Sequence, residues 1–336
     1  MNGPIDIVIP WVDEKDSKWQ MEKAYWSQKE TGGSDLSNNR YQSWDNLHLW
    51  FRAVEKCLPW FHRIFLITCG QIPAFLRTDH PKLVLVDHKS YIPDDYLPTF
   101  NSNTIEMNLF RIASLSENYI LFNDDVIPLS PIPEEYYFIN DVVCDEAVEN
   151  IITTASFGNV NRIMRHKDVN NMFIINRYFK KREIQKKHPE LWFNEAYGER
   201  LERTLACSYW YDFPGFYDHH LANALKKSVL AHLWEIEPEL LDLGSRNRFR
   251  GSSDVTQYLI RYWQICSGEF CPRRAQGKVF FPVGTDAVEL VSAIQNAVYP
   301  IICYNENCKP EEFEVLKKRV NDALESRFPD KCSFEL

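Results

Sequence analysis

The sequence predicts an α/β fold with a mostly parallel central sheet, helices on both faces in a Rossmann-like arrangement, and a helical insertion. Two observations support this prediction. Short runs rich in Val, Ile and Leu recur along the first part of the chain, and segments with helical periodicity separate them. Strands that are apolar on both sides must be covered on both faces, and a parallel sheet between helices provides that cover.

The elements can be placed in order. Strands are predicted at 5–12 (IDIVIPWV), 63–68 (RIFLIT), 82–88 (KLVLVDH) and 118–122 (NYILF). Helices are predicted at 46–58, 103–115, 223–234, 255–263 and 310–328, largely from the recurrence of apolar residues at helical spacing. We therefore expect residues 1–140 to form an α/β part, 141–203 a helical and partly basic insertion, and 204–336 a C-terminal part that completes the same domain.

Polar residues follow the predicted strands at the points where each strand ends. Asp13 follows the first strand, Gln71 the second, and the pair Asp124–Asp125 the fourth. The carboxyl ends of parallel strands meet at one edge of the sheet, where ligands bind. Carboxylates at that edge suit Mg²⁺, which takes oxygen ligands and keeps phosphate and water in its shell. The alternative is that the acidic pair caps a turn ahead of Pro128.

A second polar group follows the insertion. His219 and His220 stand just before the helix predicted at 223–234, where the helix dipole disfavours a cationic imidazole and leaves it able to accept a proton. A purely structural, hydrogen-bonded histidine pair is the alternative. Arg248 and Arg250 precede the helix predicted at 255–263, and arginines in such positions commonly meet phosphate or carboxylate.

Composition excludes some functions. A net charge of −9 argues against a nucleic-acid binder. The segment 162–187 is nevertheless basic, with nine Lys and Arg against two acidic residues, which favours either a solvated helix face or a contact with anionic lipid. Neither a signal peptide nor a membrane-spanning helix is predicted. The nine cysteines are expected to be reduced thiols, although a zinc site built from the cysteines at 266, 271, 303 and 308 is an alternative.

Four blocks of sequence carry a resemblance to a known family. They are IDIVIPWVDEKDSKW at 5–19, the segments 40–76 and 97–126 that end in NDDV, HLANALKKSVLAHLW at 220–234 with RFRGSSDV at 248–255, and the tail from IICYNEN at 301 to the end. In this order the blocks resemble the Stealth family of sugar-1-phosphate transferases. The resemblance also implies a fold of the GT-A-like kind that binds a nucleotide sugar.

The resemblance implies a reaction. A sugar-1-phosphate would pass from a nucleotide sugar, expected to be UDP-linked, to a hydroxyl of a lipid-linked or growing glycan, with release of a nucleoside monophosphate. The setting would be bacterial capsular or exopolysaccharide synthesis in the cytoplasm, with a peripheral contact to the inner face of the plasma membrane. The alternatives are a metal-dependent glycosyltransferase that releases a nucleoside diphosphate, and a non-catalytic glycan-binding protein.

The resemblance also implies residue roles. His220 is expected to be the base, with His219 as its rival. Mg²⁺ or Mn²⁺ is expected on Asp125 and Asp124, with Arg250 on the phosphate. Glu106 would orient a sugar hydroxyl or hold the base, and its alternative role is a simple charge at the start of a helix. The expected substrate-binding residues are Trp11, Asp13, Arg40, Gln71, Asn101, Ser102, Asn103 and Arg248.

Overall fold

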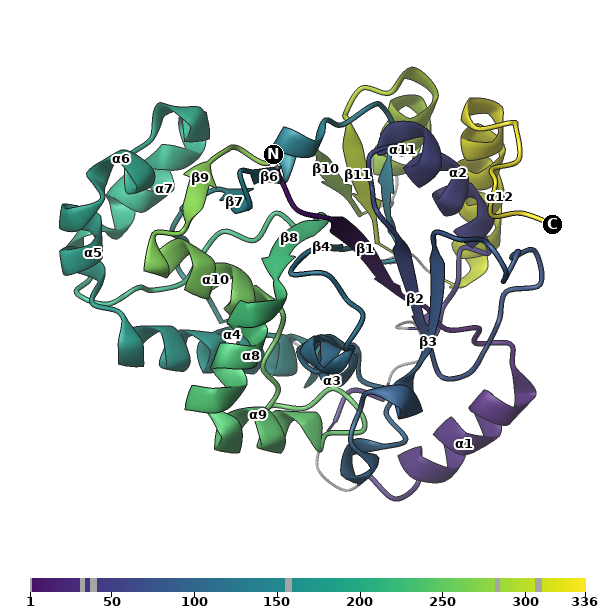
Figure 1. Ribbon diagram of the computed structural model, residues 1–336, viewed down its shortest axis with the longest axis horizontal. Coiled ribbons are helices and arrows are strands. Elements are labelled where there is room, and N and C mark those ends of the chain that lie inside the picture. The colour runs from purple at the N-terminus through teal and green to yellow at the C-terminus, as the bar shows by residue number, and fades with distance from the viewer. Residues whose placement is uncertain (1, 31–33, 37–40, 155–158, 282–284, 306–309) are drawn as a thin grey trace.

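The computed structural model in Figure 1 describes residues 2–30, 34–36, 41–154, 159–281, 285–305 and 310–336. Its central sheet has the strand order β3-β2-β1-β4-β8. The strands are β1 (Ile5–Pro10), β2 (Ile64–Thr68), β3 (Leu83–Asp87), β4 (Asn118–Leu121) and β8 (Asn223–Lys226). Strands β1 to β4 run parallel and β8 is antiparallel to β4. The predicted α/β class with a mostly parallel sheet is confirmed.

The strand order contains a point where the direction of winding reverses. From β1 the chain moves outward to β2 and β3 and then returns to the other side of β1 as β4. Right-handed crossovers place the intervening helices on opposite faces, and Figure 1 shows α2 (Leu47–Cys57) on one side of the sheet and α3 (Ser102–Met107) on the other. In open α/β sheets ligands bind at such a switch point, here outside the carboxyl ends of β1 and β4.

Helix α2 shows why the sequence folds this way. Its buried residues include Leu47, Trp50, Val54 and Cys57, whose spacing of three and four residues puts them on one side of a helix. The Trp50 indole N–H donates to the backbone carbonyl of Val126 at 3.0 Å. Burial of these side chains holds the helix against the sheet, and the indole hydrogen bond fixes the segment that follows Asp125.

Two small sheets complete the frame. One has the order β10-β11-β5, with strands Lys278–Phe280, Ile301–Tyr304 and Val126–Pro128. The other has the order β6-β7-β9, with strands Phe138–Ile139, Val142–Asp145 and Phe270–Pro272. Because β11 is antiparallel to β5 and pairs Cys303 with Val126, the C-terminal block lies beside the Asp124–Asp125 pair.

The other helices surround these sheets. They are α1 (Ser17–Ser27), α4 (Asn159–Tyr178), α5 (Lys181–Lys187), α6 (Pro189–Trp192), α7 (Leu201–Ala206), α8 (Lys227–Ile236), α9 (Pro238–Ser245), α10 (Tyr258–Ser267), α11 (Thr285–Asn296) and α12 (Pro310–Arg327). In the described part of the chain, no helix is long and apolar enough to cross a membrane. The division of the chain into the three parts given above stays a prediction.

Three predicted helices have different bounds. The segment predicted as a helix at 223–234 begins with strand β8, because pairing with the open side of β4 outweighs the helix propensity of its Ala, Leu and Lys residues. The helix predicted at 103–115 ends at Met107 and gives way to a 3₁₀ turn at Leu109–Arg111. The helix predicted at 255–263 begins at Tyr258.

Candidate functional site

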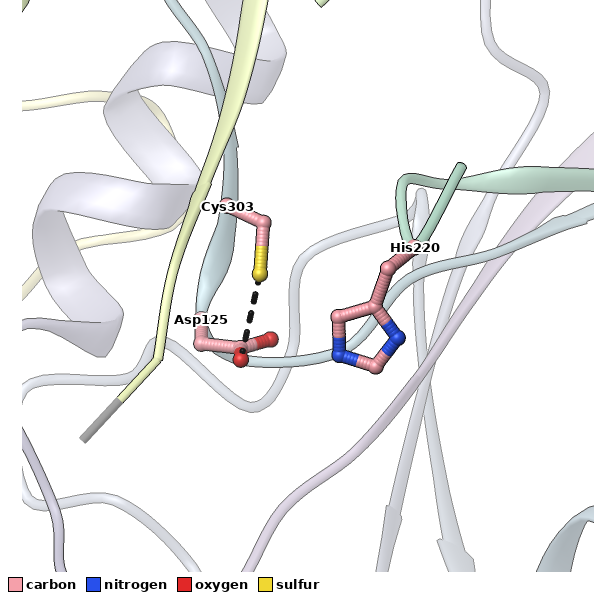
Figure 2. A group of neighbouring side chains, drawn as sticks. All are labelled: Asp125, His220 and Cys303. Carbon is pink, nitrogen blue, oxygen red and sulfur yellow. Dashed lines mark hydrogen bonds between the residues drawn. The ribbon is translucent and has the colours of Figure 1, made fainter. Parts of the chain in front are cut away.

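Three side chains from distant segments meet near the carboxyl end of β4, at the switch point of the sheet. Asp125, His220 and Cys303 present ligand atoms that all lie within 4.8 Å of one another, as Figure 2 shows. The pairing of the strands explains this meeting. Strand β8 is antiparallel to β4, so the residues before β8 lie at the carboxyl end of β4, and β11 places Cys303 opposite the residue after Asp125. The first part of the chain and the C-terminal part both contribute to the site.

His220 is held in an unusual backbone conformation. Its φ of 50° lies in the left-handed region, which costs a non-glycine residue about 1 kcal/mol or more. The Nδ1 atom lies 3.3 Å from the hydroxyl of Tyr258, and the other ring nitrogen lies on the side of Asp125 in Figure 2. Burial raises the pKa of Tyr258 well above its usual range, so this hydroxyl keeps its proton. The prediction that a helix dipole acts on His220 is wrong, because β8 follows it.

The two aspartates differ in their surroundings. Asp125 is buried and its carboxylate accepts a hydrogen bond from the Cys303 thiol at 3.3 Å, whereas Asp124 is exposed. A carboxylate, an imidazole and a thiol within this reach fit a divalent cation, and the nitrogen and sulfur atoms suit Mn²⁺ or a softer ion better than Mg²⁺. The alternative of a zinc site on four cysteines stays a prediction, because Cys308 lies outside the described residues; the thiol of Cys303 contacts Asp125.

Glu106 and Arg250 form a second polar group on α3 and the loop before α10. Burial raises the pKa of the Glu106 carboxyl to about 7, although Arg250 and Lys167 act in the opposite direction. Arg250 donates to the Ser102 hydroxyl at 2.7 Å. Glu106 therefore exchanges its proton near neutral pH, and a cation that could meet a phosphate lies close to it.

Asn101 and Asn103 hold the loop that carries Arg250. Both side-chain amides donate to the buried carboxylate of Asp254, at 3.1 and 2.8 Å. Asn247 donates to the same carboxylate at 2.6 Å. In this arrangement both asparagines, predicted to bind substrate, position the arginine loop.

The remaining predicted substrate-binding residues are more dispersed. Gln71 exchanges two hydrogen bonds with the backbone of Asp13, at 2.8 and 3.0 Å, and so joins the ends of β1 and β2. Trp11 is half-buried against the main core. Arg248 donates to the Pro98 carbonyl at 2.8 Å, and its guanidinium lies 4.1 Å from the centre of the Trp26 ring. Neither of these contacts involves Asp124 or Asp125. Arg40 lies outside the described residues.

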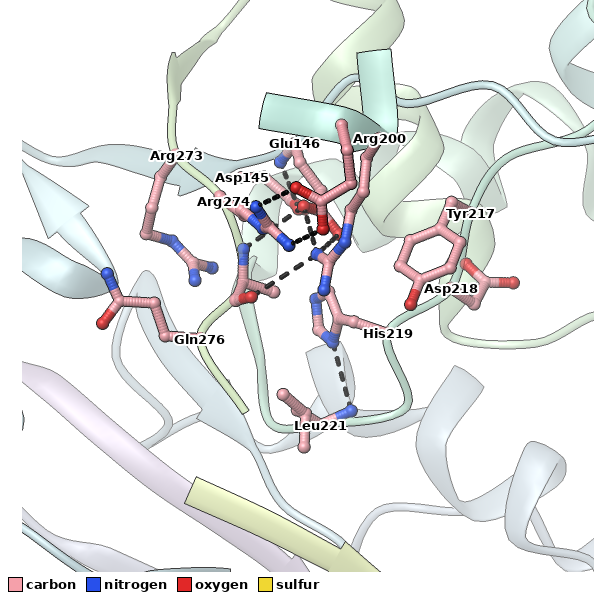
Figure 3. A network of polar contacts seen from close by, with 12 residues as sticks. Asp145, Glu146, Arg200, Tyr217, Asp218, His219, Leu221, Arg273, Arg274 and Gln276 are labelled. Atoms are coloured by element: carbon pink, nitrogen blue, oxygen red, sulfur yellow. Dashed lines mark hydrogen bonds and ion pairs between the residues drawn. The ribbon is translucent and has the colours of Figure 1, made fainter. Parts of the chain in front are cut away.

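His219 points into a different cluster, shown in Figure 3. Its Nδ1 accepts from the Leu221 backbone N–H at 3.1 Å. Burial lowers the pKa of His219 well below its usual value, and Arg261, Arg273 and Arg200 lower it further. The imidazole therefore stays neutral in a structural cluster, and the rival role of His219 as the base finds no support in its contacts.

Sequence reasoning did not assign Tyr258 or Cys303 to this site. Tyr258 is the first residue of α10, and no motif distinguishes it. Cys303 had a weak signal, since it lies on a short apolar run, IICY, that is followed by polar residues just as NYILF is. A strand read from that run would have placed the thiol near a strand end.

Fold and site together define a class: an α/β enzyme with a metal-suited cluster at the switch point of its sheet and an arginine beside a buried glutamate. Residues 40–145 match the Stealth protein CR2, conserved region 2. The chain is 36% identical to the capsular polysaccharide phosphotransferase WcwK of Streptococcus pneumoniae over 98% of both chains. It is 33% identical to the exopolysaccharide phosphotransferase cps2G of Lactiplantibacillus plantarum, over 99% of this chain and 97% of that one.

The receptor polysaccharide phosphotransferase WefC of Streptococcus gordonii is also 33% identical, over 99% of both chains. The chain therefore belongs to the Stealth family, and it is an enzyme of the phosphotransferase class. Among solved structures, the galactosyltransferase LgtC with donor and acceptor sugar analogs covers 96% of this chain and 95% of its own, at 11% identity and a TM-score of 0.39.

Proposed function

We propose that this enzyme transfers a sugar-1-phosphate from a UDP-linked sugar to a hydroxyl of a glycan acceptor and releases a nucleoside monophosphate. The setting is bacterial capsular or exopolysaccharide synthesis. Full-length relatives named as polysaccharide phosphotransferases support the reaction class. The observation that carries the proposal is the convergence of Asp125 and His220 at the switch point of the sheet.

His220 takes the proton in this reaction. The acceptor oxygen attacks the phosphorus that bears the sugar, a new P–O bond forms, and the bond from this phosphorus to the bridging oxygen breaks. The leaving nucleoside monophosphate keeps that oxygen, and the hydroxyl proton passes to Nε2 of His220. When Nδ1–H donates to the Tyr258 oxygen at 3.3 Å, Nε2 carries the lone pair that takes this proton. In this role Nε2 is not a ligand of the cation, which the aspartates would hold.

Asp125, with the adjacent Asp124, would hold the divalent cation. A bound Mg²⁺ or Mn²⁺ would neutralise charge on the diphosphate. Arg250 is placed to contact a phosphate oxygen, because Ser102 orients its guanidinium from α3. Glu106 interacts electrostatically with Arg250 and is suited to orient a sugar hydroxyl.

Identification of the released nucleotide tests the reaction. The protein would be incubated with Mn²⁺ or Mg²⁺, a panel of UDP- and GDP-sugars and a crude glycan acceptor, followed by chromatography of the nucleotides. A nucleoside monophosphate, with phosphate retained in the glycan, is the expected product. A nucleoside diphosphate would instead establish the alternative, a metal-dependent glycosyltransferase.

The cation site has its own test. Asp125→Asn removes the charge of the buried carboxylate, so we expect Mn²⁺ affinity, measured by electron paramagnetic resonance, to fall at least tenfold and turnover to fall by orders of magnitude. Asp286→Asn, on α11, is the matched control and should leave both unchanged. Equal Mn²⁺ binding by Asp125→Asn and the wild type would remove Asp125 from the cation site.

A lipid-facing surface is proposed on the insertion and on the segment that directly follows it. The aromatic side chains of Tyr209, Trp210 and Tyr211 are exposed, and the guanidinium of Arg182 lies 3.9 Å from the ring of Tyr211. Exposed Lys180, Lys186 and Lys187 belong to the same basic stretch. Aromatic rings beside basic side chains suit the interface of an anionic membrane. Peripheral attachment at the inner face of the plasma membrane would bring the enzyme to a lipid-linked glycan.

Vesicle co-sedimentation tests this surface. Lys186→Ala with Lys187→Ala should weaken binding to vesicles that contain phosphatidylglycerol, by about 1 kcal/mol per lysine, and Trp210→Ala should weaken it further. Lys318→Ala with Lys331→Ala, on and after α12, is the matched control. Lys181 is not a suitable target, because it is buried and pairs with Glu149 at 2.7 Å. Equal sedimentation of both double variants would discard the membrane contact.

A further inference from the structure

A cavity lies between the insertion and the loop that carries His220. Its volume is about 210 Å³. Its walls come from α4, α7, α10 and the segments at residues 150–152 and 215–218. The lining residues that matter here are Arg165, Asp168, Arg203, Tyr217, Asp218 and Tyr262.

The charges in this cavity balance. Arg165 pairs with Asp168 at 3.0 Å on α4. Arg203 donates to the Asn150 side chain at 2.6 Å and lies 5.3 Å from the Tyr217 ring. Carboxylates, guanidinium groups and aromatic rings in one small cavity suit a polyhydroxylated, uncharged ring: hydroxyls bond the charged groups, and the C–H faces pack on the aromatics. A phosphate would meet the carboxylates unfavourably.

The size of the cavity selects among sugars. Pockets for drug-sized ligands usually measure about 300–1,000 Å³, so a cavity of this volume holds one sugar unit and not a whole nucleotide sugar. In the proposed reaction the donor diphosphate would be bound by Arg250 and by a cation at Asp125, and neither residue lines this cavity. The cavity therefore fits the acceptor better than the donor.

The cavity is connected to the candidate catalytic residues. Asp218 lies two residues before His220 and accepts from the Tyr262 hydroxyl at 2.6 Å. Tyr262 stacks one helical turn after Tyr258, with ring centroids 6.2 Å apart, and Tyr258 contacts His220. Lys167 acts electrostatically on both Glu106 and Asp218. The cavity and the base thus share one wall, the first turns of α10.

We infer that this cavity is the acceptor subsite, which binds one neutral sugar unit of the glycan and brings its attacking hydroxyl, or that of the next unit, toward His220. The assignment of this sugar as the acceptor rests on the proposed function. The binding of a sugar in the cavity stands independently of the reaction.

Two measurements on one variant pair test the inference. In Asp168→Asn the cavity loses a carboxylate, and Asp212→Asn alters an exposed carboxylate of the same region that does not line it. Saturation-transfer NMR with methyl glycosides of glucose, galactose, N-acetylglucosamine and rhamnose measures binding without turnover. We expect at least one glycoside to bind wild type and Asp212→Asn, with affinity at least tenfold weaker in Asp168→Asn.

Kinetics supply the second measurement. The KM for the glycan acceptor should rise at least tenfold in Asp168→Asn, while the KM for the nucleotide sugar changes less than twofold. Arg203→Gln, an exposed position, should show the same split if Asp168→Asn folds poorly. Identical behaviour of Asp168→Asn and Asp212→Asn overturns the subsite, and so does an equal rise of both KM values. If wild type binds a glycoside here but releases no nucleoside monophosphate, the proposed reaction fails and the acceptor assignment fails with it, whereas the sugar site remains.

Discussion

Two adjacent histidines divide the centre of this molecule into two different clusters. His219 lies among arginines that are paired with carboxylates through short bonds, such as the bidentate Arg261–Asp145 contact at 2.8 and 2.9 Å. His220 turns the other way, toward a carboxylate and a thiol that are spaced by up to 4.8 Å. The first cluster is closed by its own hydrogen bonds, whereas the second has the spacing at which a cation or a substrate can be bound.

The comparison shows that two adjacent residues can belong to clusters with different roles, one in stability and one in catalysis. The left-handed conformation of His220 turns the two imidazoles into different surroundings. Arg200 adds two contacts to Glu146, at 2.7 and 2.8 Å, on the side of His219. We expect substitutions on that side to act on folding and substitutions on the other side to act on turnover.

Replacing each histidine by asparagine gives the largest expected difference. His220→Asn removes the proton acceptor, so turnover should fall about 10²–10⁴-fold with little change in melting temperature. In His219→Asn the amide oxygen can still accept from the Leu221 N–H, so turnover should stay within tenfold of wild type, while the altered fit among the arginines lowers the melting temperature.

Steady-state kinetics and thermal denaturation of this pair decide between the two histidines. A pH–rate profile adds a check, because loss of the base should abolish the acidic limb of kcat. If His219→Asn lost turnover as severely as His220→Asn, the division between the clusters would be wrong.

The arginine cluster offers the next largest effect. Arg261 is fully buried and contacts both Asp145 and Asp218. Its replacement in Arg261→Gln leaves buried carboxylates without their cation, which should lower the free energy of unfolding by about 3–5 kcal/mol. Arg274→Gln, which breaks a pair with the exposed Glu199, should cost less than about 1 kcal/mol. Urea denaturation measures both changes in the free energy of unfolding. Similar losses in the two variants would contradict a stabilising role of the buried Arg261 cluster.

The sequence predicted the scaffold of the site better than its details. The four parallel strands and their polar ends follow from apolar runs, because a strand buried on both faces has few alternatives. The strand β8 was predicted as a helix, because its pairing with β4 depends on a contact between residues about a hundred positions apart that local propensity does not encode. A neutral imidazole at His220 was therefore predicted from the dipole of a helix, whereas a strand follows this residue.

The same limit applies to single site residues. Asp125 was identified by its place after a predicted strand and His220 by its place before a predicted helix. The resemblance then suggested their roles, and the structure brings the two side chains together. Cys303 joins them only through the pairing of β11 with β5, and Asn101 and Asn103 turn to Asp254. Such partners are set by tertiary packing, so a polar residue near a strand end identifies a region of the site and not its own role in it.

Glu106 sharpens the comparison through the pH dependence of stability. Its carboxyl is buried and its pKa is raised to about 7, so the folded state holds this proton more tightly than the unfolded state does. Stability should therefore fall as pH rises from about 4.5 through 7, by about 3 kcal/mol at 1.36 kcal/mol per pKa unit. Glu106→Gln cannot ionise and should lack this part of the fall when urea denaturation is compared at about pH 5 and pH 8.

Glu335 provides the control for this measurement. Its pairing with Arg52 at 2.6 and 2.7 Å holds its pKa at about 2, although burial opposes the shift. A lowered carboxyl pKa contributes stability above the unfolded value and loses it only as pH falls toward 2, so Glu335→Gln should be less stable at every pH from 5 to 8 with an unchanged slope. If Glu106→Gln shows the same pH dependence of stability as the wild type, the Glu106 carboxyl is already ionised at pH 5. Its surroundings would then be more hydrated than its burial indicates.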